Sequence, residues 1–153
     1  MEVERESPRM TRFHIVIAED NPADTYLIRE ALRSHDVACE MHVVEDGQSA
    51  IELFSGGGSA CFTSGRPDLI LLDLNLPQHD GIEILRAIRN RSELAEVPVA
   101  ILTSSDSPRD RCAVNALGVT RYIQKPSELE AFLNIGSEIK ELLMGTRTRA
   151  VDS

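Results

Sequence analysis

No apolar stretch in the 153 residues approaches the length of a membrane-spanning helix. The first twelve residues, MEVERESPRMTR, mix both charges and have no apolar segment behind them, so they do not form a signal peptide. Without a transmembrane segment or a secretion signal, we expect a cytoplasmic protein that does not enter a membrane.

Cysteine is scarce, and its three positions exclude two kinds of site. Cys39, Cys61 and Cys112 are odd in number and far apart, with no C-x-x-C or Cys/His ligand spacing. Neither a zinc site nor a disulfide framework is indicated. We expect reduced thiols, with Cys61 the most reactive because it lies in a predicted loop.

Basic residues are outnumbered by acidic ones, 16 to 25, which gives a formal net charge of −9. Such a surface repels nucleic acid and anionic membranes, so we expect neither as a partner. The length suits a single domain, and an apolar content of 42% is enough for one hydrophobic core.

A glycine- and serine-rich segment, SGGGSACFTSGRP, occupies residues 55–67. Its composition predicts a flexible loop that is long for a compact domain. The segment lacks the G-K-[ST] ending of a Walker loop and the G-x-G-x-x-G pattern, so it does not indicate a nucleotide site.

Five short apolar runs predict strands, and helical patterns separate them. The continuous apolar character of the runs favours a parallel sheet covered on both faces, an α/β doubly wound fold. We expect a folded domain over 13–144, with polar tails at 1–12 and 145–153. The predicted strands are Phe13–Ala18, Cys39–Val44, Asp68–Leu72, Val97–Thr103 and Arg121–Gln124.

Capping residues mark the ends of the predicted helices. Polar N-caps are expected where a helix begins, and glycine where it ends. The predicted starts are Asn21 followed by Pro22, Asp46, Asp80 with Glu83 in a capping box, Pro108, and Ser127 with Glu130 in a second capping box; the predicted stops are Gly118 and Gly145.

Polar residues follow four of the five strands. Glu19 and Asp20 follow the first, Asp73 the third and Lys125 the fifth, and Thr103 closes the fourth. Parallel strands end at the same edge of the sheet, where doubly wound proteins bind ligands. The sequence therefore predicts a pocket of three carboxylates, a hydroxyl and an amine.

This set of groups suits phosphoryl chemistry on an aspartate. Three carboxylates repel one another unless a hard cation such as Mg²⁺ joins them. The cation and a lysine can each pair with phosphoryl oxygens, while one carboxylate attacks phosphorus. Taken alone, each residue has an ordinary structural explanation: Asp73 as a turn residue, Thr103 as a strand-end hydroxyl, Lys125 as a solvated surface charge.

The sequence closely resembles the receiver domains of two-component response regulators over about residues 13–143. The motifs that carry the resemblance are IVIAEDNPAD, DLILLDLNLPQHDGIEIL, VPVAILTSS and ALGVTRYIQKPSEL. The resemblance implies a flavodoxin-like sheet of order 2-1-3-4-5. The opening motif and the long loop before RPDLILLDLNLP resemble the single-domain regulators that partner bacterial phytochromes.

The resemblance also implies a role for each site residue. Glu19 departs from the family pattern, which often has Asp at that position. The implied roles are phosphoacceptor for Asp73; Mg²⁺ ligands for Glu19, Asp20, Asp73 and the Asn75 backbone carbonyl; phosphoryl binding for Thr103, Ser104 and Lys125; a switch aromatic for Tyr122; and a cis bond before Pro126.

The function implied is phosphorelay signalling rather than enzymatic turnover. A sensor histidine kinase would phosphorylate Asp73, and the face formed by the fourth helix, fifth strand and fifth helix would then bind a downstream protein, a phosphotransfer protein or a second copy of the chain. Two alternatives remain: a docking module that is never phosphorylated, and a phosphatase of the haloacid-dehalogenase type. That phosphatase would need a second Asp where Asn75 stands.

Overall fold

The computed structural model describes residues 12–56 and 66–152; the expectations for the N-terminal tail, the glycine-rich segment and Cys61 fall largely outside these ranges. Strands and helices alternate along the chain. The strands are β1 (Phe13–Ala18), β2 (Cys39–Val44), β3 (Leu69–Leu72), β4 (Val99–Thr103) and β5 (Arg121–Gln124), and the helices are α2 (Pro22–Ser34), α3 (Gly47–Phe54), α4 (Gly81–Asn90), α5 (Pro108–Ala116), α6 (Leu129–Leu133) and α7 (Ile135–Asp152).

The five strands form one parallel sheet in the order β2-β1-β3-β4-β5, which confirms the predicted topology. The order reverses between β1 and β3, since β2 lies on one side of β1 and the later strands lie on the other. Clefts that bind ligands form at such reversal points, beyond the carboxyl ends of the strands.

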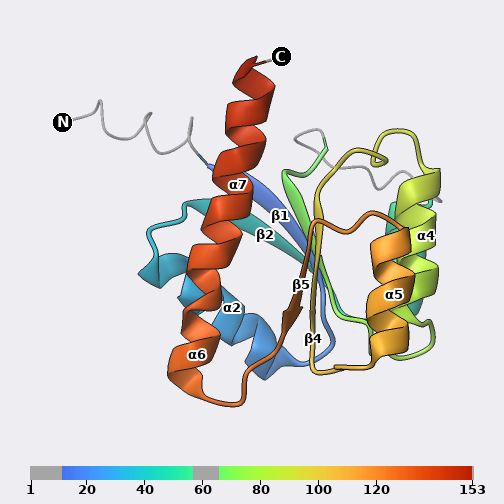
Figure 1. The fold of residues 1–153 in the computed structure, drawn as a ribbon, viewed down its shortest axis with the longest axis horizontal. Helices are drawn as coiled ribbons and strands as arrows, with labels where there is room; N and C mark the ends of the chain where they lie inside the picture. The colour runs from blue at the N-terminus through green and yellow to red at the C-terminus, as the bar shows by residue number, and fades with distance from the viewer. Residues whose placement is uncertain (1–11, 57–65, 153) are drawn as a thin grey trace.

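Helices cover both faces of the sheet (Figure 1). The strands alternate their side chains between the faces, as the period of two requires. Ile70 and Leu72 of β3 belong to a buried cluster shared with α3, α4 and α5, whereas Leu69 and Leu71 belong to a second cluster shared with α2, α6 and α7. Because β3 is buried on both faces, it positions whatever follows it rigidly.

The predicted N-caps of three helices are confirmed. Asn21 accepts a hydrogen bond from the Ala23 N–H at 2.9 Å, and Asp46 accepts one from Ser49 at 2.7 Å. Asp80 caps α4 through the Ile82 N–H at 2.7 Å. Glu83 does not complete the expected box, because its carboxylate lies 3.1 Å from His79 Nδ1.

The prediction of a capping box at Ser127 is wrong. Helix α6 begins one residue later than that motif requires, with Glu128 at the N-cap and no side-chain hydrogen bond to cap it. The last predicted helix is also divided in two at Asn134. Helix α7 then starts against α2 so closely that a Cβ on Gly136 would overlap the Ala31 carbonyl oxygen.

Gly145 does not end the last helix, which runs on to Asp152. A glycine stops a helix when it adopts a positive φ, as Gly118 does after α5 with a φ of +76°. Gly145 keeps a negative φ and lies within α7, so its presence in the sequence was a misleading signal.

Three smaller features also differ from expectation. Strand β3 starts at Leu69 rather than Asp68, and β4 starts at Val99, after Pro98, which has no N–H to donate. The Lys125–Pro126 bond is trans, as are all peptide bonds of residues 12–56 and 66–152. Within those ranges, no helix combines the length and apolar character needed to cross a bilayer.

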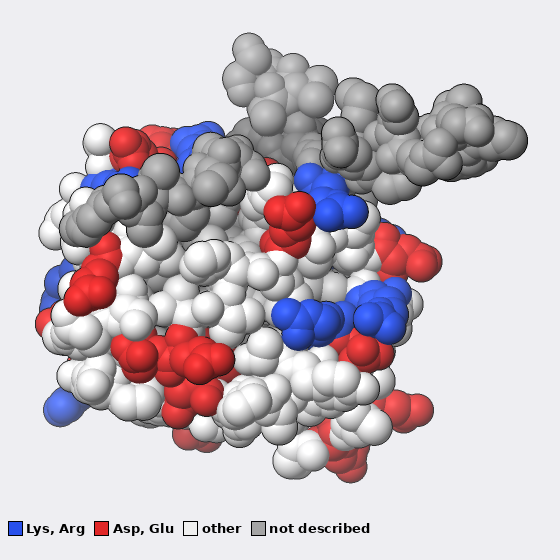
Figure 2. Space-filling model, turned by 180° about the vertical axis from the view of Figure 1, so that it is seen from behind, with Lys and Arg blue, Asp and Glu red and all other residues white. Residues whose placement is uncertain are grey.

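Charged side chains of both signs are spread over the surface. On the face turned away from the viewer in Figure 1, basic side chains form small groups between acidic and uncharged ones (Figure 2). Electrostatic attraction to a polyanion depends on a continuous basic surface, and the described part of this face does not present one.

Candidate functional site

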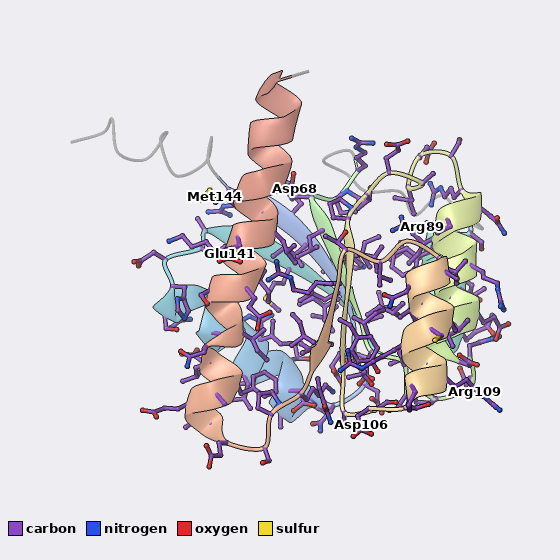
Figure 3. The ribbon with its side chains drawn as sticks, viewed as in Figure 1. Asp68, Arg89, Asp106, Arg109, Glu141 and Met144 are labelled. Atoms are coloured by element: carbon purple, nitrogen blue, oxygen red, sulfur yellow. The ribbon has the colours of Figure 1, made fainter. Side chains whose placement is uncertain are left out.

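The register of the sheet explains why the predicted site residues meet. Ala18 of β1 pairs with Leu72 of β3, so Glu19 and Asp73 follow side by side. On the far side Thr103 pairs with Gln124, and Lys125 comes next. Figure 3 shows the direction of the sheet: Asp68 precedes β3 at the upper end, and Asp106 follows β4 at the lower end, where these residues gather.

Asp73 is held in place by both main-chain and side-chain contacts. Its N–H donates to the Ala18 carbonyl at 3.0 Å, and only 5% of its surface is exposed. Oδ1 accepts a hydrogen bond from the Asn75 N–H at 3.0 Å, while Oδ2 accepts one from Lys125 Nζ at 2.8 Å. The carboxylate is thus ordered before any ligand arrives.

Lys125 donates to three carboxylates at once. Its Nζ lies 2.7 Å from Glu19 Oε1, 2.7 Å from Asp24 Oδ2 and 2.8 Å from Asp73 Oδ2. An ammonium has three donors, so this set uses all of them. Burial lowers the pKa of Lys125, but the hydrogen bonds to the carboxylates outweigh it and raise the pKa above the ordinary value.

Glu19 is more deeply buried than the other acids of the site, with 2% of its surface exposed. Besides Lys125, it accepts a hydrogen bond from the Asn21 N–H through Oε2 at 3.1 Å. Burial raises the pKa of Glu19 to about 7, and the nearby Lys125 offsets part of that effect. The glutamate that departs from the usual aspartate therefore still reaches into the pocket.

Glu19, Asp20 and Asp73 can serve as ligands for one cation. One carboxylate oxygen from each lies within 4.8 Å of the others, and Asp20 is exposed at the mouth of the cluster. Carboxylate oxygens with open access to water suit Mg²⁺, which keeps several waters in its coordination shell. Among the described residues, Lys125 is the one cation paired with these acids, so the donor set fits a divalent cation.

Thr103 is fully buried next to the acidic cluster. Its Oγ1 accepts hydrogen bonds from Asn75 Nδ2 and from the Ser105 N–H, both at 3.4 Å. These contacts are long, so the hydroxyl is loosely held. Ser104 is exposed and lines a hollow of about 390 Å³ together with Lys125 and Asp24.

Tyr122 lies outside the carboxylate cluster but contacts the same loop. Its hydroxyl donates to the Ser105 carbonyl oxygen at 2.9 Å, and the Arg111 guanidinium sits 4.2 Å from the centre of its ring. The tyrosine thus connects β5 to the loop after β4, two residues beyond Thr103.

Asp24 is the site residue that the sequence did not reveal. It is separated from Lys125 by 101 positions, and 19% of its side chain is exposed. The available signal was its place in the first turn of α2, the helix that begins at the same sheet edge as the acidic pair. An acid in a first helical turn usually only offsets the helix dipole, so this signal is weak.

The family model of the response regulator receiver domain matches residues 15–135. The chain belongs to this family. The receiver's five-stranded sheet of order 2-1-3-4-5 agrees with that membership, and the family prediction made from the motifs is confirmed.

Several relatives of this receiver are single-domain regulators of similar length. Response regulator Rcp1 of Synechocystis is 34% identical over 134 residues, which are 88% of this chain and 90% of Rcp1. The crystal structure of the phosphorylated cyanobacterial phytochrome response regulator RcpA is 38% identical, with a TM-score of 0.79 over 88% of this receiver and 96% of RcpA. The Mn²⁺-bound form of Rcp1 is 33% identical, with a TM-score of 0.74 over 84% of this receiver and 91% of that chain.

Proposed function

We propose that this receiver is a phosphorylation switch in which Asp73 accepts a phosphoryl group from a histidine kinase. The observation that carries the proposal is the environment of Asp73. A buried, ordered carboxylate lies against a lysine ammonium at 2.8 Å and within 4.8 Å of two further acids that can hold a cation. A carboxylate used only as a turn residue would need neither neighbour.

We assign Glu19, Asp20, Asp73 and the Asn75 backbone carbonyl as the residues that hold Mg²⁺. The Mn²⁺-bound form of Rcp1 supports a divalent cation in a related chain. When bound, the cation offsets the charge of the incoming phosphoryl oxygens and of the carboxylates. A phosphatase role is less favoured, since the position two residues after Asp73 is Asn75, whose amide donates to Thr103.

In the transfer step, an oxygen of the Asp73 carboxylate attacks phosphorus of a phosphohistidine. A P–O bond forms, the P–N bond breaks, and the imidazole leaves with the electron pair of that bond. Lys125 pairs with one phosphoryl oxygen, and the Thr103 hydroxyl donates to another. The exposed Ser104 leaves the approach to Asp73 open.

The signal then leaves the pocket through the loop after β4. Thr103 is only loosely held, so a phosphoryl oxygen can draw its hydroxyl away from Asn75. The Ser105 N–H bonds to Thr103 and the Ser105 carbonyl bonds to Tyr122, so a shift of the loop changes the contacts of that tyrosine. The exposed parts of α5, β5 and the α6–α7 segment form the face whose preferred conformation changes.

The proposed partners follow from the relatives and from this face. RcpA is named a phytochrome response regulator, which supports a phytochrome-type histidine kinase as the donor for this receiver. A downstream protein, a phosphotransfer protein or a second copy of the chain would bind the α5–β5 face. Cytoplasmic location and lack of nucleic-acid binding stay predictions from the sequence.

The first test is intact mass after incubation with Mg²⁺ and acetyl phosphate, with Asp73→Asn as the matched control. We expect the parent to gain one phosphoryl group and the variant none. The same incubation with EDTA should abolish the gain, because the carboxylates need the cation to accept another anion.

Beryllofluoride, a phosphoryl mimic, provides a second measurement that does not depend on the donor. With Mg²⁺ it should bind the parent and not Asp73→Asn, as followed by ¹⁹F NMR. If the parent gains no phosphoryl group and binds no beryllofluoride, the switch is refuted and the docking-module alternative stands.

A further inference from the structure

Asp24 occupies a position that the proposed phosphotransfer reaction does not require. It lies in the first turn of α2, and its Oδ2 accepts a hydrogen bond from Lys125 Nζ at 2.7 Å. The Lys125 amine, which is to pair with a phosphoryl oxygen, is therefore engaged by an acid that is not one of the three grouped around the cation position. That acid is also partly open to solvent through the hollow it lines.

By its position, Asp24 both holds Lys125 in place and competes with a phosphoryl group for the Lys125 ammonium. Oxygens of Asp24 and Asp73 each lie within 2.8 Å of the same nitrogen, so they lie within about 6 Å of each other. Their attraction to Lys125 is present with or without a phosphoryl group. Transfer replaces the −1 charge of the Asp73 carboxylate with an acyl phosphate that carries about −1.5 to −2, so the repulsion between Asp24 and this position increases after transfer.

The attraction to Lys125 and the repulsion from the phosphoryl charge differ in their consequence for the equilibrium between the unphosphorylated and the phosphorylated receiver. An interaction that is equal in both states shifts no equilibrium, whereas one that is stronger in one state shifts it away from or toward that state. The negative charge of Asp24 therefore disfavours the phosphorylated state. It also holds one of the three Lys125 donors that the phosphoryl oxygens would otherwise use.

We propose that Asp24 is a positioning residue that holds Lys125 at the site and, by competing for its ammonium, limits how tightly the receiver retains a phosphoryl group. This inference rests on the proposed function, since it concerns the same pocket. It predicts that loss of the Asp24 charge makes the phosphorylated state more favourable, which is opposite to what damage to the site would do.

The test compares Asp24→Asn with the parent at saturating Mg²⁺, so that any change in cation affinity does not enter. The measured quantity is the dissociation constant for beryllofluoride, followed by ¹⁹F NMR. We expect Asp24→Asn to bind roughly tenfold more tightly, because a unit charge is removed from a partly buried site close to the added anion. Asp24→Glu, which restores the charge, should return the constant toward the parent value.

The matched control is Asp36→Asn, which makes the same change of charge just beyond the other end of α2, where Asp36 is exposed. It should leave beryllofluoride binding unchanged. The lifetime of the aspartyl phosphate, measured by intact mass after removal of acetyl phosphate, should lengthen in Asp24→Asn by a similar factor. Thermal unfolding of all variants verifies that each is folded.

Each outcome distinguishes this inference from the proposed function. If the parent binds beryllofluoride and Asp24→Asn binds it equally or more weakly, the inference is refuted while the switch stands. If Asp36→Asn tightens binding as much as Asp24→Asn, the effect is one of overall charge and the inference is again refuted. Failure of the parent itself to bind refutes the switch.

Discussion

Gly81 offers a sharp test of how the acidic pocket is supported, because it lies directly beneath the Asp73 loop. It is buried in the first turn of α4, and its N–H donates to the Leu74 carbonyl at 3.1 Å. A Cβ at this position would lie 2.5 Å from Leu74 Cα and 3.1 Å from the Asp73 carbonyl oxygen. Because these obstacles are backbone atoms, rotation of a side chain cannot relieve the overlap.

The magnitude follows from two opposing contributions. Overpacking a well-packed interior costs about 1–3 kcal/mol, and a backbone obstacle favours the upper end. Alanine is more favourable than glycine in a helix by about 1 kcal/mol at most. We therefore expect Gly81→Ala to lower the free energy of unfolding by about 2 kcal/mol, or the Tm by roughly 4–8 °C in a domain of this size.

Gly145→Ala is the matched control, since it makes the same chemical change in α7. In the described part of the chain, no atom lies within 4 Å of a Cβ placed there, and the glycine is exposed. This variant should raise the free energy of unfolding by about 0.5–1 kcal/mol, because glycine weakens a helix interior.

Urea denaturation followed by circular dichroism gives both free energies. Gly81→Ala should also accept phosphate from acetyl phosphate more slowly than the parent, because the strain falls on the segment that follows Asp73. A Gly81→Ala protein as stable as the parent, or a destabilised Gly145→Ala, would show that the packing argument is wrong.

Three further predictions concern other parts of the receiver. The Arg89 side chain of α4 (Figure 3) donates through its guanidinium to four backbone carbonyls beyond that helix. Arg89→Ala should therefore lower the free energy of unfolding, measured by urea denaturation, by about 2–3 kcal/mol; an unchanged midpoint would contradict this. Burial raises the folded-state pKa of Glu19 from 4.5 to about 7, so the folded chain keeps a proton that the unfolded chain releases. In EDTA, the free energy of unfolding should therefore fall as the pH rises from 4.5 through about 7. Glu19→Gln cannot ionise and should lose much less stability over that range; equal pH dependence in both proteins would refute the argument. Tyr122→Phe should accept phosphate like the parent yet respond more weakly at the partner, because it loses the hydrogen bond to the loop after β4; a full response would count against that role.

Much of the fold was predictable because local pattern and topology agree in this chain. Apolar runs that end on Asp73 and Thr103 place these residues at one edge once the strands are parallel. Asn21, Asp46 and Asp80 cap helices as expected, since an N-cap depends on only three or four neighbouring residues.

The features that the sequence did not reveal depend on distant contacts. The ion pair of Asp24 with Lys125 joins positions 101 apart, and nothing local distinguishes it from an acid that offsets a helix dipole. Glu83 matches a capping box, yet its carboxylate pairs with His79. The prediction that Gly145 ends the last helix is wrong because glycine ends a helix only when its backbone turns to a positive φ, which the sequence alone does not state.

Helix α7 crosses α2 at Gly136 with no side chain of that residue between them, and this has a structural consequence. A side chain between two helices can change its rotamer to accommodate a substitution, but here α7 packs against the backbone of α2 at Ala31. Asp24 lies at the start of that same α2, so α7 packs directly on the backbone of the helix that carries an acid of the pocket. A residue with a Cβ at position 136 would therefore have to move α7 away from α2, because the nearest obstacle is a backbone oxygen of α2.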